Sequence, residues 1–94
     1  MAEFIWETPS EINQELAKRV KRIRRRKKIT QKELSERSNV SYGSLKKFEQ
    51  TGEISLLSLT KIAMELDVVN EIQNLFTKVP YGSIEEVLNE SKNS

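Results

Sequence analysis

The sequence contains no cysteine and no histidine among its 94 residues. Disulfide bonds, thiolate nucleophiles and imidazole ligands are therefore excluded, and no cofactor or metal site is predicted. Carboxylates are plentiful, but none joins a nucleophile in a pocket-like group, so we expect no enzyme activity. The chain has only two prolines and three glycines, which favours continuous helix over β structure. No apolar run approaches the roughly 18 residues of a membrane span, and no signal peptide is recognisable.

The formal net charge of +2 hides a strong asymmetry along the chain. Residues 1–17 carry four acidic side chains and no basic one, whereas residues 18–47 carry thirteen basic and two acidic side chains. Residues 48–94 are acidic again, with eight acidic and three basic side chains. Such a basic block between acidic ends predicts one surface for a polyanion and another surface for a different partner.

Apolar spacing and capping residues predict an all-α fold. We expect helices at about residues 9–27, 31–37, 41–50, 56–66, 69–76 and 84–90. Thr8 with Glu11, and Thr30 with Glu33, have the spacing of capping boxes, as does the S-I-E-E run at 83–86. The expected organisation is an N-terminal arm at 1–8, a compact five-helix domain at 9–78 and a C-terminal extension at 79–94, which holds the extra helix.

Three of these helices carry apolar side chains at the spacing of one helical face, and we expect those side chains to face inward. They are Ile12, Leu16, Val20 and Ile23 in the first helix, Leu56, Leu59, Ile62, Ala63 and Leu66 in the fourth, and Val69, Ile72, Leu75 and Phe76 in the fifth.

Both ends of the chain also hold apolar residues. Phe4, Ile5 and Trp6 are too apolar for a free tail, and two alternatives stay open: packing on the chain's own core, or an arm that contributes to a dimer. The same question applies to the apolar residues of the C-terminal extension, Tyr81, Ile84, Val87 and Leu88.

Residues 31–50, QKELSERSNVSYGSLKKFEQ, have the pattern of two short helices joined by a tight turn, a helix-turn-helix. The positions shared by the two helices are apolar (Leu34, Val40, Leu45 and Phe48), Ser35 is small, and Asn39 in the turn tolerates the left-handed region. The second helix then exposes a polar and basic face, in which the N-terminal half would lie nearest the DNA bases. That face consists of Tyr42, Gly43, Lys46, Lys47 and Gln50, with Ser44 at its edge and Ser41 as the cap.

From Val20 to Val68 the sequence resembles the helix-turn-helix of the lambda-repressor-like (Xre/Cro/cI) regulators, on the segment TQKELSERSNVSYGSLKKFEQTGEISLLSLTKIAMELDV. The resemblance implies a five-helix DNA-binding domain that acts as a dimer. It also implies that Gln31 contacts phosphate and supports a base contact, and that Arg24 and Glu49 form an ion pair. Tyr42, Gly43 and Lys47 fall at positions that often touch bases.

Beyond these positions, nine of the eleven residues from Lys18 to Lys28 are basic. We expect Arg25, Arg26 and Lys28 to reach the phosphates beside the groove, while other members of the run point away. Lys28 stands where the family usually has glycine. Since lysine does not take positive φ cheaply, the loop between the first two helices is expected to differ there. Gly43 lies inside a predicted helix, where glycine is unfavourable. Either it permits close approach of the backbone to a base, or it is a substitution without functional role that the helix tolerates (tolerated drift), and both interpretations stay open.

The favoured hypothesis is a dimeric, sequence-specific transcription regulator that binds double-stranded DNA, acts as a repressor, and works in the cytoplasm on the bacterial-type nucleoid. The alternative is an antitoxin, because the ending FEQTGEISLLSLTKIAMELD…IQNLF…PYGSIEEVL resembles Xre-type regulators encoded beside HipA-family kinase toxins. In that case the acidic C-terminal third would bind the toxin. A bare helical bundle without nucleic-acid binding would require the pattern at 31–50 to be accidental.

Overall fold

The computed structural model describes residues 7–78, and all five elements in this range are α-helices. They are α1 (Pro9–Arg26), α2 (Gln31–Ser38), α3 (Tyr42–Thr51), α4 (Leu56–Glu65) and α5 (Val69–Gln73). The all-α prediction is thus confirmed, and the first four helices lie close to their predicted bounds. The predicted helix at 84–90 and the apolar residues at 4–6 lie outside the described residues. No helix in the described part is long and apolar enough to cross a membrane.

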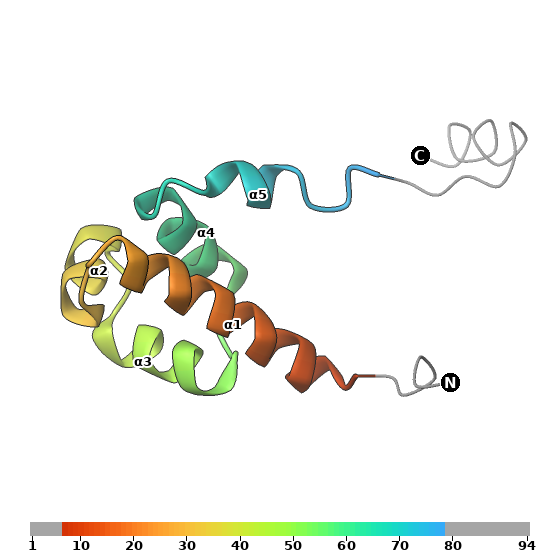
Figure 1. Ribbon diagram of the computed structural model, residues 1–94, viewed down its shortest axis with the longest axis horizontal. Coiled ribbons are helices and arrows are strands. Elements are labelled where there is room, and N and C mark those ends of the chain that lie inside the picture. The colour runs from red at the N-terminus through yellow and green to blue at the C-terminus, as the bar shows by residue number, and fades with distance from the viewer. Residues whose placement is uncertain (1–6, 79–94) are drawn as a thin grey trace, which may run out of the picture.

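The long helix α1 is the spine of the domain, as Figure 1 shows. α3 lies on one side of it, α4 and α5 lie on the other, and α2 lies at its C-terminal end (Figure 1). α1 packs on α3, α2 packs on both α3 and α4, and α5 packs on α4. The second and third helices are therefore each supported by two neighbours, which positions the outer surface of α3 rigidly.

Side-chain caps begin four of the five helices. Thr8 and Glu11 form a complete capping box at α1, and Thr30 and Glu33 form another at α2. The pKa of Glu11 is lowered, first because its carboxylate accepts the backbone N–H of Thr8 and second by the Thr8 side chain. The backbone N–H and side chain of Thr30 lower the pKa of Glu33 in the same order. Ser41 and Ser55 cap α3 and α4.

The core lies where α2, α3 and α4 meet under α1. Its fully buried side chains include Leu34, Leu45 and Phe48 of the predicted helix-turn-helix, each 0% exposed. Ile62 of α4 and Leu66 directly after α4 add to this core, and the partly buried apolar side chains packed against it are Val20, Ile23, Ile29, Ile54 and Val68. The helix-turn-helix residues therefore supply much of the core as well as an outer surface.

Three of the side chains expected to face inward are exposed instead. Ile12 is 53%, Leu16 37% and Leu56 67% exposed. The apolar face of α1 is real, but α1 has 18 residues whereas α4 has 10 and α5 only 5. The first turns of α1 therefore run past the elements that would cover them, and Leu56 lies in the first turn of α4, where its side chain points to solvent.

The fifth helix is shorter than predicted, which exposes two more apolar residues. α5 ends at Gln73, and Phe76 adopts a positive φ of 59°, which interrupts helical geometry. Leu75 is consequently 50% and Phe76 90% exposed. Between α1, α4 and α5 lies an open groove of about 350 Å³, lined mainly by apolar side chains from Leu16 to Leu75.

The turns between helices use the left-handed region at three polar residues, Lys28, Asn39 and Asp67. Asn39 has φ 61° between α2 and α3, as predicted. Lys28, after α1, has φ 58°, so the expectation that lysine would avoid this conformation was wrong. The N–H of Ile29 donates to the carbonyl of Arg24 at 3.2 Å, and that of Lys28 to Arg25 at 3.0 Å. These bonds hold the end of α1 and offset the backbone cost at Lys28, about 1–2 kcal/mol.

Candidate nucleic-acid interface

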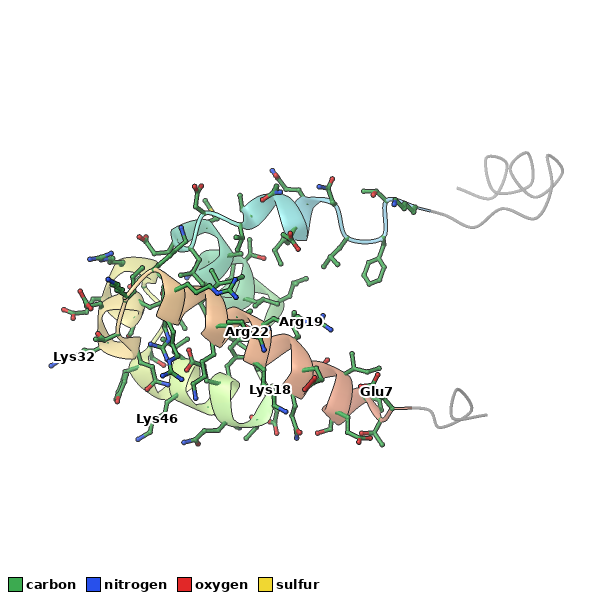
Figure 2. All side chains as sticks on the ribbon, in the orientation of Figure 1. Glu7, Lys18, Arg19, Arg22, Lys32 and Lys46 are labelled. Atoms are coloured by element: carbon green, nitrogen blue, oxygen red, sulfur yellow. The ribbon has the colours of Figure 1, made fainter. Side chains whose placement is uncertain are left out.

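The outer surface of α3 faces solvent on the side opposite its buried residues. Leu45 and Phe48 are fully buried, whereas Tyr42 keeps 47% of its surface exposed. The other exposed side chains of this face belong to Lys46, Lys47 and Gln50. Figure 2 shows Lys46 projecting away from the body of the domain. A helix with one packed side and one polar, basic side has the form that enters a DNA major groove.

The first turn of α3 combines a polar cap with a position that carries no side chain. The Ser41 hydroxyl accepts the backbone N–H of Ser44 at 3.1 Å and donates to the Ser44 hydroxyl at 2.8 Å. A Cβ atom placed on Gly43 would meet no heavy atom within 4 Å. Packing within the domain therefore places no demand for glycine at position 43, and an alanine would fit there.

Two lysines of α3 make contacts that the sequence did not predict. The ammonium of Lys46 lies 5.8 Å from the centre of the Tyr42 ring, a cation–π contact one helical turn apart. The ammonium of Lys47 lies 3.3 Å from a carboxylate oxygen of Glu53. Glu53 follows the end of α3, so helical spacing gives no signal for this second pair. Both lysines remain exposed and are able to exchange these contacts for others.

A buried network ties α3 to α1 and to the start of α2. The Nε and Nη2 atoms of Arg24 donate to the two carboxylate oxygens of Glu49 at 2.7 and 2.9 Å. The Nη1 atom of Arg24 donates to the Ile29 carbonyl at 2.8 Å. The side chains of Arg24 and Glu49 are only 10% and 2% exposed. This bidentate pair joins the last turns of α1 and α3, so it sets how α3 is presented.

Gln31 belongs to the same network. Its side-chain Nε2 donates to Oε1 of Glu49 at 2.8 Å. The Glu49 carboxylate thus accepts three hydrogen bonds, two from Arg24 and one from Gln31. The sequence did not predict the Gln31–Glu49 contact. This contact holds the Gln31 side chain between the start of α2 and the last turn of α3. The amide oxygen of Gln31 takes no part in the network.

A family model described as helix-turn-helix matches residues 20–70, more than half of the chain. The chain belongs to the lambda-repressor-like helix-turn-helix family. It is accordingly a DNA-binding transcription regulator. No curated protein and no solved structure matches the chain.

In this helix-turn-helix protein the basic residues of α1 fall on different sides of the helix. Arg24 points inward, whereas a shallow open depression on the outer side of α1 is lined by Lys18, Lys21, Arg22, Arg25 and Arg26. Arg25 and Arg26, predicted as phosphate contacts, therefore lie together with three further cations. Lys28 lies beyond the helix in the α1–α2 turn and does not line that surface.

The spacing of these five cations is unfavourable in the free helix-turn-helix protein. Lys18 and Arg22, Lys21 and Arg25, and Arg22 and Arg26 are each four residues apart, so they are neighbours on the helix surface. Each such like-charge pair destabilises a helix by about 0.2–0.5 kcal/mol. Among residues 7–78, the ion pairs that reach this group consist of the single contact between Lys18 and Glu15 at 3.0 Å.

Proposed function

We propose that this protein is a sequence-specific transcription repressor that binds double-stranded DNA as a homodimer, with α3 in the major groove. The observation that carries the proposal is the exposed basic face of α3, held from behind by the Arg24–Glu49 pair. A groove-reading helix needs such a rigid rear support, because base contacts depend on the position of each side chain.

The residues of α3 and its flanks fall into groups according to the part of the DNA that each would contact. Tyr42, Gly43 and Lys47 would face base edges, with Lys46 giving a point-charge contact to guanine or phosphate. The backbone N–H of Gln31, at the start of α2, would donate to a phosphate, and its free amide oxygen would accept a hydrogen bond from a base or from a side chain that contacts a base. The remaining proposed contacts are Ser41, Ser44 and Gln50 near the groove, and Arg25, Arg26 and Lys28 at phosphates.

A homodimer would place two copies of α3 about 34 Å apart, one turn of DNA, so that each reads one half-site. Such a protein would work in the cytoplasm, on the DNA of a bacterial-type nucleoid. The exposed apolar side chains of the described part, several of which exceed 50% exposure, are consistent with a chain that assembles.

An antitoxin role is the second candidate. The exposed Leu75 and Phe76 belong to the IQNLF segment on which the antitoxin resemblance partly rests, and exposed apolar residues are typical of protein-binding surfaces. The remaining part of that resemblance, residues 80–88, lies outside the described residues. Co-purification with a kinase-like toxin encoded next to the gene supports this role, whereas an isolated gene argues against it.

The repressor proposal is tested by selecting a preferred duplex from a random library and measuring its affinity for variants of α3. We expect Lys46→Ala with Lys47→Ala to lose about 1–3 kcal/mol of discrimination between the selected and a scrambled duplex. Glu53→Gln should raise the affinity for the selected duplex, because it releases Lys47 from its 3.3 Å contact with the Glu53 carboxylate.

The matched control is Lys61→Ala with Lys78→Ala, which removes the same charge from α4 and from the chain beyond α5. Circular dichroism confirms that each variant is folded before binding is compared. Equal affinity of the α3 variant and the unchanged protein for the selected duplex would refute the assignment of α3 to the groove.

A further inference from the structure

The outer side of α1 presents a continuous cationic surface that is separate from the recognition face of α3. Five side chains line it, Lys18, Lys21, Arg22, Arg25 and Arg26, and no residue of another helix contributes to its lining. Figure 2 shows Lys18 and Arg22 on α1 and Lys46 on α3, so the two surfaces lie on different elements. We propose that Lys18, Lys21 and Arg22 extend the phosphate contact of Arg25 and Arg26 into a second DNA contact, which binds the sugar-phosphate backbone of duplex DNA outside the groove that α3 reads.

The surface is not an ordinary solvated helix face. On α2, by contrast, an acidic and a basic side chain share the exposed face: Glu33 and Arg37 are four residues apart and 3.6 Å from each other. From Lys18 to Arg26 the helix contains no acidic residue, and the like charges repel along one side. A bound polyanion removes this repulsion, so the free protein tolerates an arrangement that the complex favours.

The dimensions of the surface suit a DNA strand. Lys18 and Arg25 are seven residues apart, which spans about 10.5 Å along α1 at 1.5 Å per residue. A strand of duplex DNA carries a phosphate about every 3.4 Å of helix axis, so about three phosphates pass over this length. Flexible lysine and arginine side chains can meet them without the precise placement that base readout requires.

The position of the surface separates it from base readout. α1 turns Arg24 toward α3, and the backbone of Asn13 lies against Gly52 at the end of α3. The five cations lie on another side of α1, so they contribute affinity and not sequence preference. The backbone that Lys18, Lys21 and Arg22 bind belongs either to the same duplex beyond the site or to a second duplex.

The inference rests on the proposed function, so the experiment uses the full chain with both a selected and a scrambled duplex. The variant is Lys21→Gln with Arg22→Gln, which spares every residue assigned to the groove and to its flanking phosphates. The control, Lys61→Gln with Lys78→Gln, removes the same charge from elsewhere. Dissociation constants are measured from low to high salt for each protein.

We expect the α1 variant to flatten the slope of log affinity against log salt by about 1.8, or about 0.9 for each lost phosphate contact. The ratio of affinities for the selected and scrambled duplexes should stay unchanged. The thermal midpoint of the free variant should be equal to or above that of the unchanged protein. Equal slopes for the α1 variant and the control would overturn the inference.

Duplex length identifies the source of the backbone. If the slope difference disappears on a duplex trimmed to the selected site, the surface binds flanking DNA of the same duplex. If the difference persists and the protein captures a second labelled duplex, the surface bridges two duplexes. A chain that prefers no sequence refutes the proposed function, whereas the slope on random duplex still decides whether α1 binds DNA.

Discussion

The two sides of α1 use the same kind of residue in opposite ways. On the inner side, Arg24 is buried, and three of its nitrogen atoms donate hydrogen bonds. On the outer side, Arg22 and Arg25 are exposed among other cations. The inner arginine is needed to hold the domain together, and the outer arginines cost the free domain some stability. A basic run therefore has no single role, because helix periodicity divides its residues between the domain's internal packing and its outer surface.

The largest effect should follow from breaking the inner side. Glu49→Ala leaves the guanidinium of Arg24 buried without its counter-charge, a change that typically costs about 3–5 kcal/mol. We expect the free energy of unfolding, measured by urea denaturation, to fall by about this amount. Gln31 also loses its partner, which adds to the effect.

The matched control is Glu53→Ala, because Glu53 also faces a lysine but its side chain is 70% exposed. It should change the free energy of unfolding by less than about 1 kcal/mol. If Glu49→Ala prevents folding altogether, Glu49→Gln is measured instead. It keeps the shape of the side chain and one acceptor oxygen, so the loss in the free energy of unfolding should be smaller and measurable. Similar values for the Glu49 and Glu53 variants would show that burial does not separate the two pairs.

Much of this architecture could be predicted from local sequence. Thr8 with Glu11 and Thr30 with Glu33 mark the starts of two helices because a capping box involves residues only three apart. The burial of Leu34, Leu45 and Phe48 follows from helical periodicity in the same way. Periodicity did not predict the exposure of Ile12 and Leu16. It marks which face of a helix is apolar, and it carries no information on how far the neighbouring helices extend.

Contacts between distant residues were the least predictable part of the candidate site. Arg24 and Glu49 are 25 residues apart, and only the family resemblance paired them. The resemblance assigned Gln31 to DNA and gave no hint that its amide nitrogen binds Glu49. Lys47 and Glu53 meet because the chain turns after Gly52, which spacing along a helix cannot reveal. The DNA contacts themselves stay predictions.

Gly43 in α3 and Gly52 directly after it repeat the contrast between an outer and an inner position, with a smaller expected effect. Gly52 has φ 83°, and a Cβ there would lie 2.6 Å from the Asn13 carbonyl carbon. Gly52→Ala should therefore destabilise the domain by more than the 1–2 kcal/mol that positive φ alone costs. Gly43→Ala meets no atom within 4 Å and should stabilise α3 by about 1 kcal/mol.

Thermal denaturation measures both effects, and DNA titration decides what Gly43 is for. If the backbone at Gly43 approaches a base, Gly43→Ala should raise the thermal midpoint and weaken binding to the selected duplex. Unchanged binding would favour tolerated drift. A gain of stability from Gly52→Ala would contradict the close contact between the end of α3 and α1.

The smallest expected effect concerns the two capping boxes, which lie on exposed turns. The pKa values of Glu11 and Glu33 are lowered from the ordinary 4.5, chiefly by the backbone N–H groups of Thr8 and Thr30. A carboxylate with a lowered pKa in the folded state contributes stability above its unfolded pKa and loses it as the pH falls through the folded pKa. The contribution is therefore complete above about pH 4.5 and is lost as the pH falls further, through the lowered pKa values. Glu11→Gln with Glu33→Gln keeps a capping side chain at each position but cannot titrate. Urea midpoints measured from pH 6 to pH 2 should therefore decline less steeply for this variant than for the unchanged protein.

The control is Glu36→Gln, which removes a carboxylate outside any capping box. The urea midpoint of this variant should keep more of the steep decline. An equal flattening by both variants would show that overall charge, and not the caps, sets the acid sensitivity.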